Sequence, residues 1–274
     1  MSKKSSLGQK MAEDILCSVL NISPAQFFLK KNELILSAGQ IKKFDRIEAE
    51  IQKGLPLQYA LGQAEFYGRD FTVNRDVLIP RPESELLVEY ALKYLQKKSR
   101  KKLRIIDLGC GSGCLIISIA KESENKRCEI FAADVSAAAL RVAKANARKH
   151  RLKQIKFYRS DLFSSPKLPA KFDLIIANLP YLPANYLQTL PKPIVRSLKY
   201  EPKIALSGGR DGLDIIKKLI RLLPQKLDRD GLALIEFDPS QTNAAKKLLK
   251  KIDLKFQVIK DLNGRNRLCA VTKG

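Results

Sequence analysis

The chain has 274 residues, and 45% of them are apolar, so one large domain or two small ones with a sizeable core can form, and wholesale disorder is disfavoured. Lys and Arg total 51 against 28 Asp and Glu, and the net charge of +23 points to acidic or nucleic-acid-rich surroundings without indicating a fold. The single histidine, His150, weakens any multi-histidine metal site or histidine-based triad, and five cysteines without a CxxC pair or zinc spacing indicate reduced thiols.

The first residues do not resemble an export signal, because Glu13 and Asp14 interrupt the apolar stretch that would have to follow Lys3 and Lys4. No run in the sequence approaches the roughly 18 apolar residues that a spanning helix needs. We therefore expect a soluble, cytoplasmic protein with no membrane association and no bound metal.

Residues 1–72 carry helical signals and no strong strand. Apolar residues recur at helical spacing near Ile15, Ser23 followed by Pro24 is typical of a helix start, and a third amphipathic stretch runs to Ile51. Such a helical bundle could simply cover the next domain, or it could dock a substrate, and the sequence favours neither.

The segment 58–82 contains Gly62 and Gly68, which interrupt short β-prone runs and indicate a hairpin linker. A helix is expected to follow at about 83–97. We therefore divide the chain into an N-terminal helical substrate-docking domain at 1–72, a β-hairpin linker region at 73–82 and a catalytic domain at 83–274.

From Leu103 onward, strand and helix patterns alternate, with helices such as 137–149 and 213–223 between the strands. This alternation predicts an α/β domain with a mostly parallel sheet covered on both faces. The last two strands flank an Asn263-Gly264 turn and should form an antiparallel hairpin at the end of the sheet. The seven expected strands are 103–108, 129–133, 155–158, 174–177, 233–237, 256–260 and 268–271.

A glycine-rich turn follows the first of these strands, in the order Gly109, Cys110, Gly111, Ser112, Gly113. Glycines allow a ligand to approach the backbone closely, and the helix that follows presents free N–H groups. The spacing G-x-G-x-G differs from the G-x-G-x-x-G of dinucleotide-binding loops.

Two further elements suit a cofactor that carries adenosine. Asp134 ends the second strand, where an acid can accept hydrogen bonds from ribose hydroxyls. The loop 160–163 after the third strand, which includes Leu162, could line an adenine pocket, although Asp161 could equally be a helix N-cap. These positions do not separate S-adenosylmethionine from NAD.

The run Asn178-Leu179-Pro180-Tyr181 after the fourth strand favours methyl transfer. The nitrogen of a planar –NH2 group is poorly nucleophilic because its lone pair is delocalised. The side-chain oxygen of Asn178 and a backbone carbonyl could accept its two N–H bonds, while Tyr181 stacks on the planar group. We therefore predict that Asn178 and Tyr181 are catalytic.

With these motifs, the sequence resembles the class I S-adenosylmethionine-dependent methyltransferases, and most closely the HemK/PrmC family, which methylates the glutamine N5 of peptide chain release factors. The most specific features are QYALG at 58–62, EFYG at 65–68 and VLIPRPESE at 77–85. The runs YEP at 200–202 and ALSGGRDGL at 205–213 agree as well, as do Asp261, Gly264 and Arg267 near the C-terminus.

This resemblance implies a Rossmann-like domain with a seven-stranded, mostly parallel sheet whose last strand is antiparallel, preceded by a small helical domain. It implies S-adenosylmethionine contacts at 109–113, Asp134, Leu162 and Asn178. Residues 178–181 would bind the glutamine of the release factor Gly-Gly-Gln motif. We expect a monomer with a protein substrate and no specific nucleic acid partner.

The sequence departs from the family pattern at two positions. Leu179 stands where the family has proline, which relaxes the restraint on Asn178 but keeps the backbone carbonyl. Leu162 stands where many relatives have an aromatic residue, so we expect the adenine to pack differently here.

Two other functions compete with this interpretation. A nucleic-acid adenine N6-methyltransferase would use the same Asn-x-Pro-Tyr motif to hold an –NH2 group, and the charge of +23 would suit phosphate binding. The LIPRPE block and the lack of a nucleic-acid recognition module disfavour it. A non-catalytic ribosome-associated binder is disfavoured because the glycine loop and Asn178 are intact. The charge itself fits solvated lysine-rich helix faces or recognition of an acidic partner.

Overall fold

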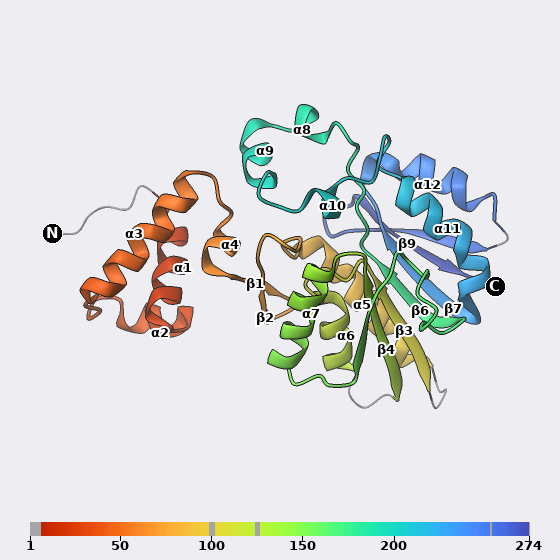
Figure 1. Ribbon diagram of the computed structural model, residues 1–274, viewed down its shortest axis with the longest axis horizontal. Helices are drawn as coiled ribbons and strands as arrows, with labels where there is room; N and C mark the ends of the chain where they lie inside the picture. Colours follow the sequence, from red (N-terminus) through yellow and green to blue (C-terminus); the bar gives the residue numbers. More distant parts are fainter. Residues whose placement is uncertain (1–6, 99–101, 124–126, 253, 274) are drawn as a thin grey trace.

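The computed structural model describes residues 7–98, 102–123, 127–252 and 254–273, and residues 1–6 of the expected N-terminal domain lie outside this range. A small helical unit precedes a larger α/β unit, and the two lie side by side along the long axis of the molecule (Figure 1). The helical unit contains α1 (Gln9–Leu20), α2 (Pro24–Lys30), α3 (Ala38–Gln52) and α4 (Leu57–Leu61).

The helical unit has its own small core, which Ile15 and Val19 of α1 form with Ile47 of α3. The expected start of α2 is confirmed, because the Ser23 hydroxyl accepts from the backbone N–H of Gln26 in a capping box. The unit is therefore held together by local helix packing, separately from the larger core that follows.

A β-hairpin and the segment 73–84 lie between the helical unit and the first long helix of the α/β unit. The hairpin strands are β1 (Gln63–Phe66) and β2 (Arg69–Thr72), paired antiparallel. This hairpin lies earlier in the chain than the expected 73–82, which contains no strand before the short 3-10 helix η1 (Pro82–Ser84). It falls within the segment 58–82, in which Gly62 and Gly68 indicated a hairpin, and the Val73 N–H after β2 still donates to the Gly62 carbonyl at 3.1 Å.

The α/β unit contains seven strands in the order β5-β4-β3-β6-β7-β9-β8. Neighbours from β5 to β7 are parallel, whereas β9 is antiparallel to both β7 and β8, so the expected antiparallel end of the sheet is confirmed. The expected fifth strand begins earlier than predicted. The strands are β3 (Leu103–Leu108), β4 (Cys128–Asp134), β5 (Ile155–Arg159), β6 (Phe172–Ala177), β7 (Leu227–Glu236), β8 (Lys255–Lys260) and β9 (Asn266–Thr272).

Helices cover both faces of this sheet (Figure 1). One face packs against α5, α6 and α7, and the other packs against α11 and α12. Short segments α8, α9 and α10 form an excursion between β6 and α11. The helices of this unit are α5 (Glu85–Gln96), α6 (Cys114–Glu122), α7 (Ala137–Lys149), α8 (Tyr186–Thr189), α9 (Lys192–Leu198), α10 (Lys203–Leu206), α11 (Asp214–Lys226) and α12 (Thr242–Leu249), with a short 3-10 helix η2 (Pro239–Gln241) before α12.

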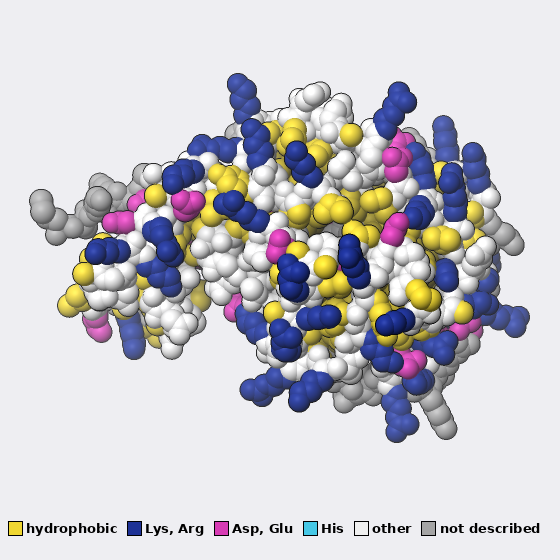
Figure 2. All heavy atoms as spheres, viewed as in Figure 1, with side chains coloured by type: hydrophobic (Ala, Val, Ile, Leu, Met, Phe, Trp, Pro, Cys, Tyr) yellow, Lys and Arg dark blue, Asp and Glu magenta, His cyan; other side chains and the backbone are white. Residues whose placement is uncertain are grey.

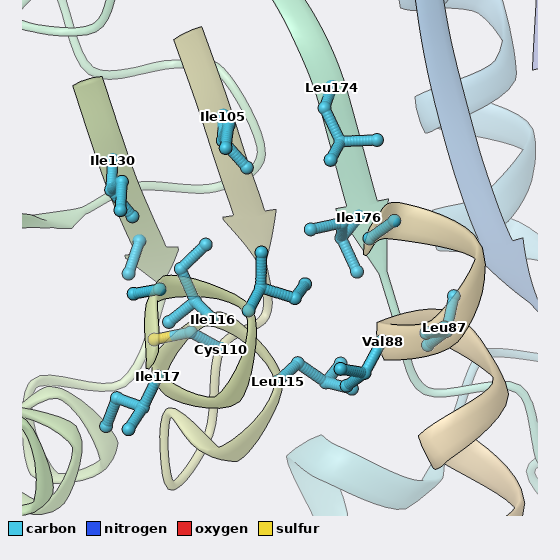
Figure 3. Close-up of a cluster of buried hydrophobic side chains, with 14 of the residues drawn as sticks. Leu87, Val88, Ile105, Cys110, Leu115, Ile116, Ile117, Ile130, Leu174 and Ile176 are labelled. Atoms are coloured by element: carbon cyan, nitrogen blue, oxygen red, sulfur yellow. The ribbon is translucent and has the colours of Figure 1, made fainter. Parts of the chain in front are cut away.

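Side chains alternate between the two faces along each central strand, because successive residues of a strand point to opposite sides. On β3, Ile105 belongs to the cluster beneath α5 and α6, whereas Ile106 belongs to the cluster beneath α11. Figure 3 shows Ile105 with Ile130 and Leu174 on neighbouring strands, facing the helices. This two-sided burial explains why the central strands read as continuous apolar runs.

A buried asparagine joins the hairpin to the α/β unit. Asn146 of α7 is fully buried; its side-chain oxygen accepts from the Thr72 N–H at 2.7 Å, and its amino group donates to the Thr72 and Ser112 carbonyls, both at 2.9 Å. Phe66 and Phe71 of the hairpin lie in the same core as α5 and α6. The hairpin is therefore structurally part of the α/β unit.

Figure 2 shows Lys and Arg side chains spread over most of the visible face, with Asp and Glu few and scattered. On this face the positive charge is distributed over both units rather than gathered on one element. In the part of the chain that the structure describes, we find no helix with the length and apolar character to cross a membrane.

We predict that Asn146→Ala lowers the free energy of unfolding by about 2–4 kcal/mol, because it removes three hydrogen bonds to the backbone and leaves the buried Ser112 carbonyl without this partner. Urea denaturation would measure the change. The control is Lys144→Ala, an exposed position on the same helix, which should shift the value by less than about 0.5 kcal/mol. Equal stabilities of the two variants would contradict the assigned role.

Candidate active site

The glycine turn after β3 is shaped by three residues in the left-handed region, where side chains are strained. Gly109, Gly111 and Gly113 have φ of +69°, +53° and +80°. A Cβ on Gly113 would lie 3.1 Å from Ile117 and 3.3 Å from Ala143, so this glycine lets α6 pack closely against α7.

Gly111 has a different surrounding. Its nearest neighbour to an added Cβ would be the Gly109 carbonyl at 4.0 Å, so the space beside it is open. Gly111 lines a cavity at the carboxyl ends of the strands, here called the large cavity, which measures about 990 Å³ including its open mouth. Gly113 is not among the lining residues, so the five predicted loop residues divide into four at the cavity and one beneath it.

Asp134 at the end of β4 holds the glycine turn in place. Its carboxylate accepts from the Gly111 N–H at 2.9 Å and from the Ser136 N–H at 2.8 Å. Burial raises the pKa of Asp134, and these two backbone donors oppose the shift. Each oxygen keeps a second lone pair, so the carboxylate can also accept from hydroxyls in the cavity.

Leu162 lines the opposite wall and adopts a left-handed backbone with φ of +50°, which is uncommon for a residue with a side chain. The Ser160 hydroxyl donates to its carbonyl at 2.8 Å and thereby stabilises the turn. No helix begins at Asp161 within the described residues; this exposed residue instead pairs with Lys218 at 2.5 Å. The N-cap alternative for Asp161 is therefore not realised.

Asn178 follows β6 and lies on the same cavity, as do Leu179 and Pro180. Its amino group donates to the Ser84 hydroxyl at 2.8 Å, and that hydroxyl donates to Glu236 at 2.7 Å. Because the amino group is used in this way, the side-chain oxygen of Asn178 is the atom left to accept a hydrogen bond from a ligand.

Tyr181 does not line the large cavity. It lines a smaller adjoining one with Asn178 and Leu179, and its phenol donates to Glu236 at 3.3 Å. Burial raises the pKa of Tyr181 and raises that of Glu236 to about 7. Asn178 and Leu179 therefore line both cavities, and of these two only Asn178 offers a polar side chain where the cavities adjoin.

A glycine-rich loop fixes the backbone of this run from behind. A Cβ at Gly208 would collide with the Pro180 carbonyl, and one at Gly212 would collide with the Tyr181 carbonyl. Gln241 donates from its amide to the same Tyr181 carbonyl at 2.8 Å. The ALSGGRDGL run noted in the sequence thus provides close backbone packing beneath residues 180 and 181.

Leu179, the departure from the family proline, is buried with 4% of its surface exposed. Its Cδ2 atom would lie 3.0 Å from a Cβ on Gly109, so the leucine covers the first glycine of the turn. This contact gives Leu179 a packing role between the ends of β3 and β6.

Arg81, from the LIPRPE block, lines both cavities and pairs with the buried carboxylate of Glu201 at 2.5 Å. Glu201 also accepts from the Ile79 N–H at 3.2 Å. The two motifs that carried the family resemblance are thus joined to each other at the mouth of the cavity.

Three polar residues of this region were not singled out from the sequence as site residues. Ser84 contacts Asn178, and Glu236 contacts Tyr181, as described above. The sequence signal for Ser84 was its place in the ESE run at 83–85. Asp107 is fully buried beneath the turn, and no partner reaches its carboxyl oxygens among the described residues. Burial, followed by the charge of Asp134, raises the pKa of Asp107 well above its ordinary range.

The cavity suits the expected cofactor. An open space beside Gly111, hydrogen-bond acceptors on Asp134 and apolar walls at Leu162 and Leu115 fit an adenosine-bearing molecule with a charged end near the glycine turn. Val135 and Ala139 also line it, and the sequence patterns did not indicate them.

Known families match both parts of the chain. A family model described as the PrmC N-terminal domain matches residues 3–62, and one described as a methyltransferase domain matches residues 99–201. The release factor glutamine methyltransferase of Bacillus cereus is 34% identical over 264 residues, covering 95% of this chain and 91% of the relative. That of Bacillus subtilis (strain 168) is 37% identical, covering 86% and 82%.

Solved structures share the fold. A methyltransferase from Pyrococcus furiosus superposes with a TM-score of 0.53 at 16% identity, covering 87% of this chain and all of the other. The hMettl16 catalytic domain in complex with MAT2A 3'UTR hairpin 6 gives a TM-score of 0.57 at 16% identity, covering 88% and 84%. At these identities the likeness concerns the fold alone.

We predict that Gly111→Val lowers the affinity for S-adenosylmethionine about tenfold or more, because the added side chain enters the cavity and a loss of about 1.4 kcal/mol suffices. Titration calorimetry would measure it. Gly264→Val is the matched control, since Gly264 also has a positive φ of +74° with nothing within 4 Å of its Cβ position. Both variants share about 1–2 kcal/mol of backbone strain, but only the first should lose cofactor affinity.

Proposed function

The chain belongs to the release factor glutamine methyltransferase family, and from this we propose that it transfers a methyl group from S-adenosylmethionine to the N5 side-chain nitrogen of the glutamine in the Gly-Gly-Gln motif of peptide chain release factors. The observation that carries the proposal is the orientation of Asn178, whose amino group is bound to Ser84 and whose oxygen is left for a ligand. The relatives' names favour this substrate over adenine in nucleic acid.

The residues around the large cavity would hold the cofactor, which supplies an electrophilic methyl group when it is bound. We propose that Gly109, Cys110, Gly111 and Ser112 pass along it with their backbone, and that Asp134 accepts from its hydroxyls. Gly113 acts from beneath by allowing α6 to pack against α7. The further cofactor contacts proposed are Leu162 and Asn178.

The substrate glutamine would enter from the side of the smaller cavity, which Asn178, Leu179 and Tyr181 line. Pro180 adjoins it on the wall of the larger one. The Asn178 oxygen would accept one N–H of the glutamine amide, and a backbone carbonyl of the run would accept the other. This arrangement aims the nitrogen lone pair at the methyl group, which is catalysis by positioning and electrostatics.

Tyr181 would contact the planar amide with its ring while its phenol stays bound to Glu236. Because burial raises the pKa of Tyr181, the phenol remains protonated and does not act as a base near neutral pH. Proton loss from the product nitrogen can follow methylation, so the reaction requires no strong general base at this position.

We propose that the helical unit docks the release factor rather than merely covering the α/β unit. None of its described residues lines the large cavity. It contacts the excursion after β6 where Tyr200 donates to the Lys53 carbonyl at 3.2 Å and Arg196 donates to the carbonyls of Gln52 and Lys53. Such a unit projects beside the site, where extended contacts could orient a protein substrate. We further propose a monomeric, cytoplasmic enzyme, because release factors act on cytoplasmic ribosomes.

Asn178→Ala should reduce kcat on the order of a hundredfold, because it removes one positioning interaction at the reacting nitrogen. Its affinity for S-adenosylmethionine should change much less. Leu179→Pro is the matched control in the same run: it keeps the carbonyl and should retain activity. Methyl transfer to release factor, followed by peptide mass mapping, measures both. Near-normal turnover of Asn178→Ala would refute the assignment.

A fragment beginning at Gln63 should bind S-adenosylmethionine but methylate a whole release factor with a much lower kcat/KM, because remote binding contacts are lost. The cut falls before the hairpin, since removing Phe66 and Phe71 would open the core. Calorimetry and a methylation assay report the two properties separately. If the fragment methylates release factor as efficiently as the full chain, the docking role is wrong. A higher rate on ribosomal RNA or duplex DNA than on release factor would overturn the substrate assignment.

A further inference from the structure

Four side chains form a continuous hydrogen-bonded chain beside the site, and its two middle members are buried. It runs from Asn178 to Ser84 at 2.8 Å, from Ser84 to Glu236 at 2.7 Å, and from Tyr181 to Glu236 at 3.3 Å. Ser84 and Glu236 are exposed by only 2% and 1% of their surfaces. These two middle members therefore have little solvent to exchange partners with, and the state of one constrains the next.

The ionised carboxylate of Glu236 can only accept hydrogen bonds, so the hydroxyls of Ser84 and Tyr181 must both donate to it. With its proton committed to Glu236, Ser84 can only accept from Asn178. The amide of Asn178 must then present its amino group to Ser84 and its oxygen to the cavity. An Asn178 amide turned the other way would place two oxygens against each other and offer a donor to the substrate.

A proton on Glu236 removes this constraint. The carboxyl group could then donate to Ser84, which would free the Ser84 hydroxyl to donate in turn to the oxygen of Asn178. In that arrangement the amino group of Asn178 would face the substrate amide. Two –NH2 groups cannot hydrogen bond to each other as donor and acceptor, because the amide nitrogen lone pair is delocalised.

We propose that Glu236, acting through Ser84, is a positioning residue that keeps the Asn178 oxygen directed at the substrate nitrogen, and that protonation of Glu236 releases this orientation. The inference rests on the proposed function, since it explains how the amide-binding atom is selected. It assigns a role to Glu236 and to Ser84, which lies on the wall of the large cavity.

The charged groups around Glu236 set where it titrates. Burial raises its pKa to about 7, while Arg267 on β9 opposes the shift and Glu83 on η1 adds to it. Arg267 is shared with Asp261 at 3.4 Å. On α5, the carboxylate of Glu85 instead accepts from the Tyr67 N–H at 2.7 Å. Asp238, after the end of β7, acts on Tyr181 in the same direction as Glu236.

The sign of the pH dependence follows from this. Above about pH 7, Glu236 is ionised and the Asn178 oxygen faces the cavity; as pH falls through this value, the proton enters and kcat should fall. Asp107 and Asp134 also have raised pKa values, but they lie at the cofactor end. Their protonation should alter the affinity for S-adenosylmethionine, which is measured separately.

The experiment compares the pH profiles of kcat for full-length wild-type protein and Glu236→Gln, with release factor as the substrate. A range of about pH 5.5 to 9 brackets a group that titrates near neutrality. The wild type should lose activity on the acid side, whereas Glu236→Gln should be lower at high pH and flat across the range. The control is Glu129→Gln at the start of β4, away from the cavity, where Glu129 pairs with Lys102 and Lys156. This variant should keep the wild-type profile. A Glu236→Gln profile with the wild-type acid limb would overturn the proposal.

Ser84 provides a second test that does not depend on the folding of the Glu236 variant. Ser84→Ala should lower kcat on the order of tenfold at pH 8 with little change in cofactor affinity, because the Asn178 amide is no longer held. Ser84→Thr restores the hydroxyl and should recover activity. Equal kcat values for the alanine variant and the wild type would overturn this positioning role, which we call the Glu236–Ser84 relay.

A readout without substrate separates this proposal from the proposed function. In the free protein, the side-chain amide resonances of Asn178, followed by NMR, should shift with an apparent pKa near that of Glu236 and stay constant in Glu236→Gln. Invariant resonances in the wild type would reject the relay even if release factor is methylated. A normal titration with no methylation of release factor would instead reject the substrate and leave the relay standing.

Discussion

The hydrogen bond from Asn178 to Ser84 joins segments 94 positions apart and brings three parts of the fold to one point. Asn178 comes from the end of β6, Ser84 from the turn before α5, and Glu236 from the end of β7. Parallel strands place their carboxyl ends at the same edge, so β6 and β7 deliver their polar residues side by side. The orientation of the reacting amide depends on this buried meeting point.

Around that point, glycines allow the backbone to pack closely. Gly208 and Gly212 let one loop pack directly on the carbonyls of Pro180 and Tyr181, and Gly109 leaves room for Leu179. Backbone packed against backbone has few ways to move, which suits a site that works by positioning. Leucine is accommodated in place of the family's proline because the Leu179 side chain packs over Gly109.

The two ends of the site differ in their electrostatics. At the cofactor end, Asp134 is anchored by two backbone N–H groups, and Asp107 beneath it is fully buried. At the substrate end, Glu236 is buried but receives two hydroxyls and lies near Arg267. Lys and Arg side chains are distributed over the visible surface rather than gathered in one place (Figure 2).

The amino-acid sequence alone determined the order of strands and helices, the antiparallel end of the sheet and the places of the glycine turn, Asp134 and the Asn178 run, because apolar periodicity and turn residues are local signals. Gly62 and Gly68 indicated a hairpin within 58–82, but the bounds 73–82 given to the linker exclude its strands, because β-prone residues do not show where pairing begins and ends. Only the tertiary structure decided that Gly113 lies beneath the cavity, that Tyr181 faces a second one, and that Ser84 and Glu236 stand behind Asn178. These relations depend on contacts between segments far apart in the chain, and no local pattern carries them.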